Sequence, residues 1–173
     1  MVKTIRVKQL HPLAIVPSYA HDGDSGFDLR AVEDVFIRPG HSVRVRTGLA
    51  FEIPEGYEIQ VRPRSGVTAK TSLRVQLGTI DSGYRGEVSV LVDNIAPVEP
   101  NKSSLDFLVI KNIRGEEESS PFRTVKEEYW IHVGDRIAQG VLVPVHQAAF
   151  EVVEDFEAAT KRVTNGFGST GII

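Results

Sequence analysis

The stretch SVRVRT at residues 42–47 alternates polar and apolar side chains, and YEIQVR at residues 57–62 does the same. In an extended chain, this period of two places the apolar side chains on one face. Each stretch therefore predicts a β-strand that buries one face in a core. Further runs rich in β-branched residues also predict strands, at residues 88–92, 105–113, 124–131 and 137–145.

Turn-forming residues separate these runs at short intervals. Examples are DGD at residues 22–24, PG at 39–40 and SG at 82–83. No long segment has a 3.6-residue period, and a short helix is expected only near Arg64. Many short strands at this spacing predict an all-β, jelly-roll-like barrel with one short helix. The Gly-rich end of the chain predicts an extended C-terminal arm.

The composition is typical of a folded protein with one domain. Of 173 residues, 41% are apolar and 25% charged, with a net charge of -3. No apolar run approaches the roughly 20 residues that span a bilayer, and the N-terminus lacks the apolar stretch of a signal peptide. We therefore expect a soluble, cytoplasmic protein with no membrane partner. The mild acidity, without a block of like charges, also argues against broad nucleic-acid binding.

Cysteine is absent, which excludes disulfides, thiolate metal sites and cysteine nucleophiles. None of the five histidines has the spacing that places two metal ligands on one helix face. Lone surface or capping histidines are the better interpretation. Without an extended basic surface, any phosphate binding must depend on a few residues at one site.

The string RPRSG at residues 62–66 is the first candidate for such recognition. A Ser and a Gly at the start of a helix supply a hydroxyl and free backbone N–H groups, and arginine adds a guanidinium that suits phosphate oxygens. The alternative is a helix cap with solvated arginines. On the string alone, the alternative is favoured because short Arg-Ser-Gly strings are common.

Two further strings combine glycines with side chains that could contact a ligand. GTIDSGYRGE at residues 78–87 would allow a tight hairpin with Asp81 and Tyr84 projecting from it, or an ordinary hairpin turn, and nothing within the string decides between the two. GFGSTG at residues 166–171 holds an aromatic ring that could stack on a base, among small residues that could hold phosphates. A flexible tail without function is the alternative, but such tails seldom embed a lone aromatic residue.

These three strings, together with DSGFDLRA at residues 24–31 and GDRIAQ at 134–139, resemble the five motifs of the trimeric dUTPase family in order and approximate spacing. The resemblance extends from residue 24 to residue 171. It implies a homotrimer that hydrolyses dUTP to dUMP and pyrophosphate, which keeps uracil out of DNA and supplies dUMP for dTMP synthesis. The segment at residues 97–128 lies outside the motifs and is similar to the insertion of dUTPases encoded by phages of Gram-positive bacteria, in which case the bacterial host cytoplasm is the compartment.

The resemblance also implies roles for single residues. Asp81 would be the general base that accepts a proton from water as it attacks the α-phosphorus in line. Gln139 would position that water or the α-phosphate. Tyr84 would lie against the deoxyribose and leave no room for a 2′-hydroxyl. One Mg²⁺ is expected on the triphosphate, with Asp28 reaching it through a metal-bound water rather than as a direct ligand.

The remaining implied residues bind the substrate. Main-chain groups around Gln76, Leu77 and Gly78, with Ser89 on the return strand, would read uracil. Arg64, Ser65 and Gly66 would hold the triphosphate. The tail of another subunit would bring Phe167 onto the uracil, while Arg162, Gly168, Ser169 and Thr170 close over the outer phosphates. Val163 and Asn165 stand where the family tail usually has glycines, which would stiffen closure.

We expect residues 1–160 to form a single domain, with an inserted hairpin at about residues 97–128, and residues 161–173 to form a mobile arm that closes a neighbouring subunit's site. In the insertion, residues 105–110 and 129–131 should pair as a hairpin on the flank of the barrel, with an exposed tip near residues 116–120. It would either only add buried area or bind a regulatory protein, so a catalytically weak dUTP-binding regulator is the alternative function. Because no motif falls in it, we expect replacement of residues 114–121 by a short turn to leave hydrolysis within a few-fold.

Overall fold

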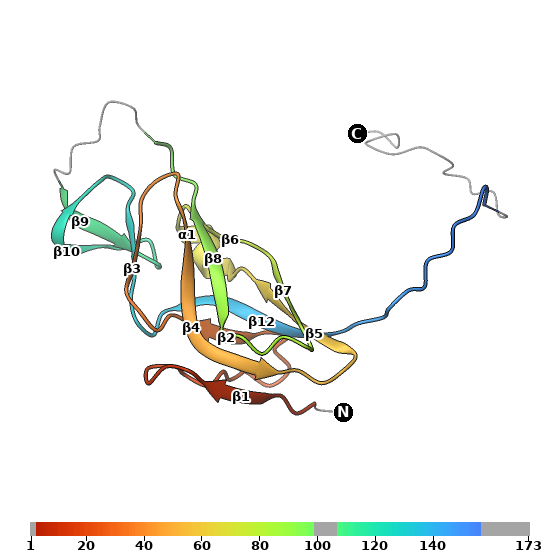
Figure 1. The fold of residues 1–173 in the computed structure, drawn as a ribbon. Coiled ribbons are helices and arrows are strands. Elements are labelled where there is room, and N and C mark those ends of the chain that lie inside the picture. Colours follow the sequence, from red (N-terminus) through yellow and green to blue (C-terminus); the bar gives the residue numbers. More distant parts are fainter. Residues whose placement is uncertain (1–2, 99–106, 157–173) are drawn as a thin grey trace.

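The computed structural model describes residues 3–98 and 107–156. These residues form twelve β-strands and one short helix (Figure 1). The first half of the chain contains β1 (Arg6–Gln9), β2 (Phe27–Arg30), β3 (Val35–Ile37), β4 (Ser42–Glu52), β5 (Tyr57–Arg62), α1 (Ser65–Lys70), β6 (Leu73–Val75) and β7 (Gly78–Asp81). The second half contains β8 (Val88–Asn94), β9 (Phe107–Asn112), β10 (Glu117–Thr124), β11 (Tyr129–Ile131) and β12 (Arg136–Pro144).

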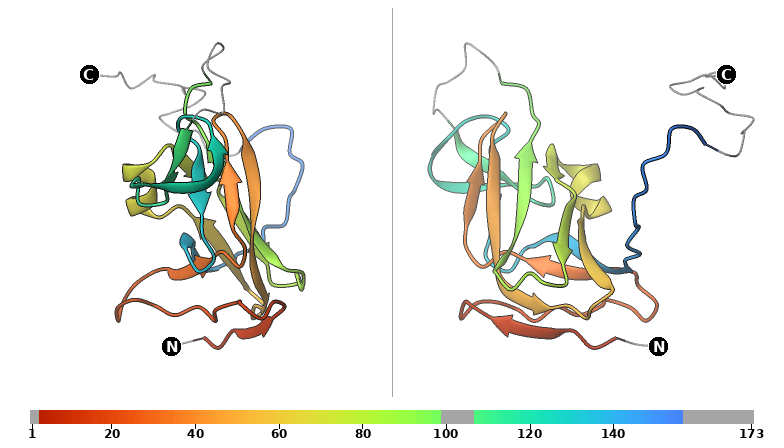
Figure 2. Two further views of the ribbon diagram at one scale, coloured as in Figure 1. Left: turned by 90° about the vertical axis from the view of Figure 1, so that its left-hand side faces the viewer. Right: turned by 45° about the vertical axis from the view of Figure 1, so that its right-hand side comes forward.

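The strands form three four-stranded sheets, in the orders β1-β4-β8-β6, β2-β12-β5-β7 and β10-β9-β11-β3. Strands distant in the sequence pair with each other, as in β2 with β12, and Figure 2 shows the sheets stacked around a shared interior. The predicted all-β, jelly-roll-like class with one short helix is confirmed. The sheets do not close into a barrel, because each described sheet keeps two end strands.

The core consists of the apolar faces that the alternating patterns predict. Val45 on β4 and Ile59 on β5 are fully buried, as are Leu29 on β2 and Val90 on β8. The strand β4 extends five residues beyond the predicted stretch. Gly48 (φ 65°) lies at an irregularity where the register with β8 shifts, and a Cβ there would lie 2.7 Å from the Cβ of His11.

The inserted segment differs from the predicted hairpin. The strand β9 does lie beside β11, but the two are parallel, so they cannot be the arms of one hairpin. The antiparallel partner of β9 is β10, in a stretch predicted as an exposed tip. The pattern of β10, EESSPFRT, is too polar to suggest a strand. It is an edge strand, where polar side chains and a proline are tolerated.

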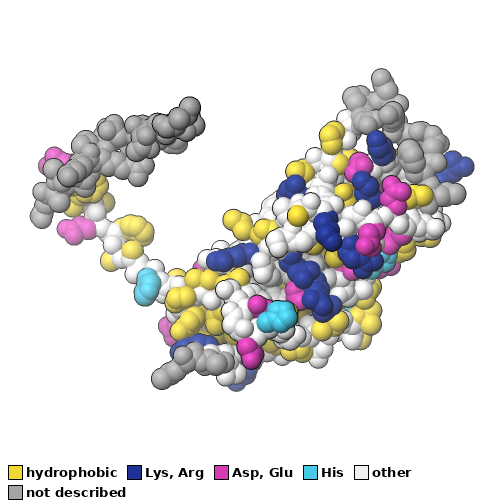
Figure 3. Space-filling view, turned by 180° about the vertical axis from the view of Figure 1, so that it is seen from behind, with side chains coloured by type: hydrophobic (Ala, Val, Ile, Leu, Met, Phe, Trp, Pro, Cys, Tyr) yellow, Lys and Arg dark blue, Asp and Glu magenta, His cyan; other side chains and the backbone are white. Residues whose placement is uncertain are grey.

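The chain leaves the body after β12. Within the described residues, the hydrogen bond from Val145 N to Gly56 O (2.8 Å) is the last backbone hydrogen bond between this end of the chain and the body. Residues 145–156, which we call the arm, then run outward, and Figure 3 shows hydrophobic side chains on the arm clear of the body. Phe150 and Val152 are almost completely exposed. Within the described residues, no helix is long and apolar enough to cross a membrane.

Candidate active site

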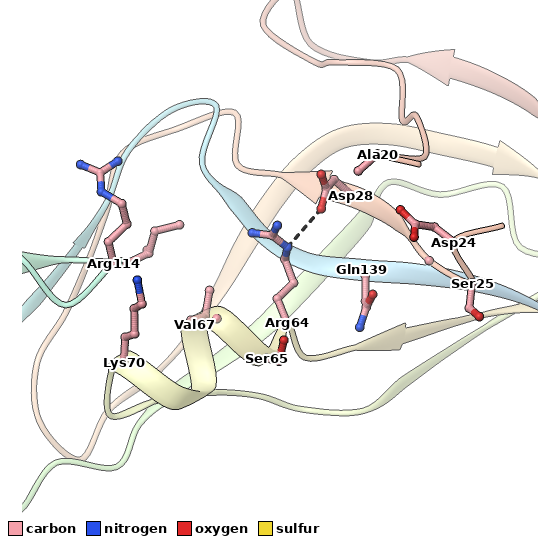
Figure 4. A pocket seen from close by; sticks show the side chains of 13 residues that line it. Ala20, Asp24, Ser25, Asp28, Arg64, Ser65, Val67, Lys70, Arg114 and Gln139 are labelled. Atoms are coloured by element: carbon pink, nitrogen blue, oxygen red, sulfur yellow. Dashed lines mark ion pairs between the residues drawn. The ribbon is translucent and has the colours of Figure 1, made fainter. Parts of the chain in front are cut away.

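A polar cleft of about 400 Å³ opens beside α1 (Figure 4). It is lined by the residues Ala20, Asp24, Ser25, Gly26, Asp28, Arg64, Ser65, Gly66, Val67, Lys70, Ile113, Arg114 and Gln139. They come from the loop before β2 and from β2 itself, from α1 and the residue before it, from β12 and from the turn between β9 and β10. The cleft therefore brings together predicted residues from three motifs that are far apart in the sequence.

Asp28 lies at the centre of the cleft between two guanidinium groups. Arg64 Nε is 3.1 Å from Asp28 Oδ1, and Arg136 NH1 is 3.3 Å from Asp28 Oδ2. Arg64 also donates a hydrogen bond from NH1 to the carbonyl oxygen of Arg136 (3.1 Å). The two ion pairs neutralise the carboxylate and hold Arg64 across the cleft, where a phosphate oxygen can accept from the same guanidinium.

Gln139 lies on β12 between the strands β2 and β5. Its Nε2 donates to the carbonyl oxygen of Pro63 at 2.9 Å, so its Oε1 faces the opposite way, toward Gly26. A Cβ at Gly26 would lie only 2.6 Å from that Oε1. The glycine of the first motif therefore makes room for the glutamine of the fourth, a relation that the sequence spacing of more than one hundred residues conceals.

The start of α1 presents Ser65 and Gly66 on the cleft surface, and both are exposed. Arg64 occupies the N-cap position with extended backbone angles and makes no side-chain cap hydrogen bond. A capping role for this string, the alternative considered from the sequence, therefore has no support in the geometry.

A second, separate cavity of about 280 Å³ lies where the chain turns from β7 to β8. The tight hairpin predicted here is not formed, because β7 pairs with β5 while β8 pairs with β4 and β6 in another sheet. We keep the short name hairpin for this segment, residues 78–89. The lining residues of the cavity are Arg44, Thr79, Ile80, Asp81, Tyr84, Glu87, Val88 and Ser89. The exposed ring of Tyr84 folds back over Gly86, and its hydroxyl donates to the carbonyl oxygen of Glu87 (3.2 Å). A Cβ at Gly86 would lie 2.4 Å from the Tyr84 hydroxyl, so only glycine permits this placement of the ring.

Glu87 anchors this hairpin, a role that the sequence analysis did not predict. Its carboxylate accepts from Arg46 Nε at 3.2 and 3.1 Å and from the backbone N–H of Gly48 at 2.8 Å. The partners lie on β4, about forty positions earlier in the chain, so no local pattern predicts the contact.

The two cavities hold different predicted residues, and neither contains both Asp81 and Gln139. On β5, Gln139 pairs with Arg62 and Asp81 pairs with Glu58. These positions are four residues apart, about 13 Å along the strand. Asp81 and Gln139 of one chain are therefore too far apart to contact the same phosphate group of a ligand.

Some predicted site residues lie elsewhere. Gln76, Leu77 and Gly78 line neither cavity; the side chain of Gln76 donates to Asp93, and Leu77 is 80% exposed. Arg162, Phe167, Gly168, Ser169 and Thr170, like the two substituted glycine positions, lie outside the described residues.

The described residues contain no group of three or more acidic or histidine side chains that could hold a metal ion by themselves. The cleft offers the carboxylates of Asp24 and Asp28, and the latter is already paired with two arginines. This donor set suits Mg²⁺, which keeps most of its waters and binds phosphate oxygens of a nucleotide with one or two carboxylates nearby.

Comparison with known proteins matches these features. The family model described as dUTPase matches residues 13–99 and 109–171. The deoxyuridine 5′-triphosphate nucleotidohydrolase of Picosynechococcus sp. is 43% identical over 169 residues, covering 96% of this chain and 98% of the relative. The Helicobacter pylori protein of the same name (strain 26695) is 39% identical over 171 residues and covers 97% of both chains.

Solved structures are also similar. A mutant dUTPase of Staphylococcus bacteriophage 80alpha with dUpNHpp superposes with a TM-score of 0.90 at 33% identity, covering 99% of this chain and all of that one. A mutant dUTPase from phage phi11 of S. aureus, which coordinates a structural Mg(II) ion, has a TM-score of 0.85 at 33% identity and covers 90% of this chain and all of that one. With its five motifs, its fold and these near full-length matches, the chain belongs to the dUTPase family.

Proposed function

We propose that this protein hydrolyses dUTP to dUMP and pyrophosphate with Mg²⁺, in the cytoplasm, where it keeps uracil out of DNA and supplies dUMP. The observation that carries the proposal is the cleft in which Arg64, Ser65 and Gln139 converge beside a carboxylate neutralised by two arginines. Such a cleft fits a polyanion, and the family membership identifies which one.

The reaction is water attack at the α-phosphorus. Asp81 is exposed on the hairpin and accepts the proton from the attacking water. Gln139, fixed by Pro63, orients that water or the α-phosphate with its amide. Arg64, with the Ser65 hydroxyl and the backbone of Gly66, binds the phosphate oxygens as negative charge shifts toward the leaving pyrophosphate. A bound Mg²⁺ would neutralise charge on the phosphates, and Asp28 would help to hold it through a water.

The hairpin cavity selects the nucleoside. Tyr84 lines this cavity, and its ring would pack against the deoxyribose and exclude a 2′-hydroxyl by shape. Ser89 and the main chain of residues 76–78 pair with the uracil edge, and a cytosine would leave buried polar groups unpaired. Phe167 stacks on the base, and Arg162, Gly168, Ser169 and Thr170 close over the phosphates.

The complete site requires more than one chain, and we propose a homotrimer. Two features support it: Asp81 and Gln139 of one chain are too far apart to act on one phosphate, and the arm carries exposed apolar side chains away from its own body. In the assembly, the hairpin of one subunit faces the cleft of another, and a third contributes the residues beyond 160. No observation favours the alternative of a weakly catalytic regulator.

The proposal is tested by incubating the protein with dUTP and Mg²⁺ and measuring pyrophosphate and dUMP. Turnover of dUTP, with little of UTP, dCTP or dTTP, is expected, and EDTA should abolish it. Absence of pyrophosphate release in a folded preparation would overturn the proposed activity.

A further inference from the structure

The turn between β9 and β10 is a rigid structure built around a buried asparagine. Asn112 Oδ1 accepts from the backbone N–H groups of Arg114 (2.9 Å) and Glu116 (3.2 Å), and its own backbone closes the turn with Gly115 and Glu116. Gly115 takes the left-handed conformation (φ 76°) that the turn requires. Because backbone and asparagine groups make these bonds, the conformation of the turn does not depend on the side chain of Arg114.

This turn is packed directly on the end of α1. A Cβ at Gly115 would lie 2.3 Å from the carbonyl oxygen of Lys70, so the turn approaches the helix as closely as a backbone without a side chain allows. Ile113 is buried in the core beside it. The insertion therefore does not lie on a remote flank: it places Ile113 and Arg114 in the wall of the cleft that Arg64 and Ser65 line.

Arg114 presents free hydrogen-bond donors at this end of the cleft. Its Nε donates to Glu116 Oε2 at 2.7 Å, and this hydrogen bond lowers the pKa of Glu116 and raises the pKa of Arg114, so both remain charged at neutral pH. Within the described residues, no hydrogen bond is found for the two terminal nitrogens of Arg114, and its side chain is 65% exposed. Because Glu116 holds the guanidinium through Nε, the two terminal nitrogens can donate hydrogen bonds to a phosphate.

Lys70 adds a second cation. It lies at the last position of α1, and Figure 4 shows it below Arg114 at the same end of the cleft. The carboxylate of Glu116 lies beside both cations, and the carboxylates of Asp135 and Glu118 are also close enough to raise the pKa of Arg114. A phosphate would therefore be held there by the free donors of Arg114 and by Lys70, rather than by an excess of positive charge. Ser65 and Lys70 are five residues apart on α1, about 7.5 Å, which is comparable with the length of a triphosphate chain.

We propose that Arg114, carried by the insertion and assisted by Lys70, binds the terminal phosphate of the nucleotide in the cleft. This inference rests on the proposed function, because it assumes that the α-phosphate lies at the Gln139 end. The β- and γ-phosphates then extend along α1 toward Lys70, and the guanidinium of Arg114 receives the last of them. The insertion is thus part of the substrate site, and a short turn in place of residues 114–121 would weaken binding, contrary to the expectation from the sequence.

The test compares two non-reacting ligands that differ only in the terminal phosphate: dUDP with an α,β-imido bridge, called dUDP below, and the α,β-imido analogue of dUTP. Calorimetry with Mg²⁺ should show that Arg114→Ala weakens the analogue about tenfold while dUDP binding changes less than twofold. In turnover assays, KM for dUTP should rise by a similar factor with kcat little changed. Arg114→Lys should restore part of the affinity, because it keeps the charge but not the paired donors.

Lys126→Ala is the matched control: it removes one exposed positive charge from the same insertion, at a residue outside the cleft. It should leave both affinities unchanged. Equal weakening of dUDP and the analogue by Arg114→Ala, or no weakening of either, would overturn the inference. The parent protein is assayed with dUTP before any variant is made. If it releases no pyrophosphate, the proposed function itself fails.

Discussion

The cleft beside α1 and the cavity of the hairpin at residues 78–89 are built by different means. The cleft takes its residues from several distant segments, and its central Arg64–Asp28–Arg136 arrangement is fixed by two ion pairs. The hairpin cavity is mostly one local segment, shaped by Gly86 and anchored to β4 through Glu87. The cleft carries charge that suits phosphates, whereas the hairpin carries the ring and the carboxylate that suit a nucleoside and a water.

We infer from this difference that one chain holds two halves of an active site, the cleft and the hairpin cavity, which cannot act together on one substrate. Along β5 the positions paired with Asp81 and Gln139 are separated by four residues. A half-site on each of two surfaces is productive only when the surfaces of different copies meet. Substitutions in one half should therefore affect a different step from substitutions in the other.

The largest effect should come from Asp81→Asn in the hairpin. The amide keeps the size of the side chain but cannot accept a proton, so turnover should fall about 10³-fold. Binding of the α,β-imido analogue should stay within a few-fold of the parent, because the cleft is intact. A loss of turnover below about tenfold would mean that another base operates.

Gly26→Ala should perturb the cleft alone. The new methyl group would lie 2.6 Å from Gln139 Oε1, so the glutamine must rotate away from Pro63. We expect kcat to fall about tenfold, with binding of deoxyuridine, which carries no phosphate, unchanged. Ser18→Ala is the control, because Ser18 is exposed and lines neither cavity. Equal kcat in the two variants would show that Gln139 does not act in the reaction.

Tyr84→Ala should alter selectivity in the hairpin. Without the ring, a 2′-hydroxyl is no longer excluded, and the ratio of kcat/KM for dUTP to that for UTP should fall about tenfold. Tyr84→Phe keeps the ring and should keep the ratio. If Tyr84→Ala discriminates as well as the parent, another group reads the sugar.

The smallest effect should follow Glu87→Gln, which weakens the anchor of the hairpin. Loss of the charged hydrogen bonds to Arg46 should lower the free energy of unfolding by about 1 kcal/mol, measured by denaturant titration at fixed protein concentration. Glu33→Gln is the control, because Glu33 approaches Arg46 only to 3.8 Å. An equal loss in both variants would contradict the anchoring role.

The sequence predicted the strands whose burial alternates, because period-two patterns such as that of residues 57–62 follow directly from one buried face. It did not predict β10, whose polar residues are tolerated only because it is an edge strand. The motif residues of the cleft were identified from the sequence. Their separation from Asp81 was not, because it depends on strand pairing across the sheet. The position of Arg114 in the cleft wall depends on how Gly115 packs against Lys70, a contact between segments 45 residues apart.

In the proposed trimer, the cleft and the hairpin of one chain belong to different active sites. Asp81→Asn and Arg64→Ala inactivate one half each, and each variant alone should be folded and nearly inactive. When the two are co-expressed and assemble at random in equal amounts, about one quarter of the sites should combine an intact hairpin with an intact cleft from different chains. The mixture should therefore regain about a quarter of the parental turnover. Activity no higher than that of the separate variants would show that each chain completes its own site, and would contradict the account.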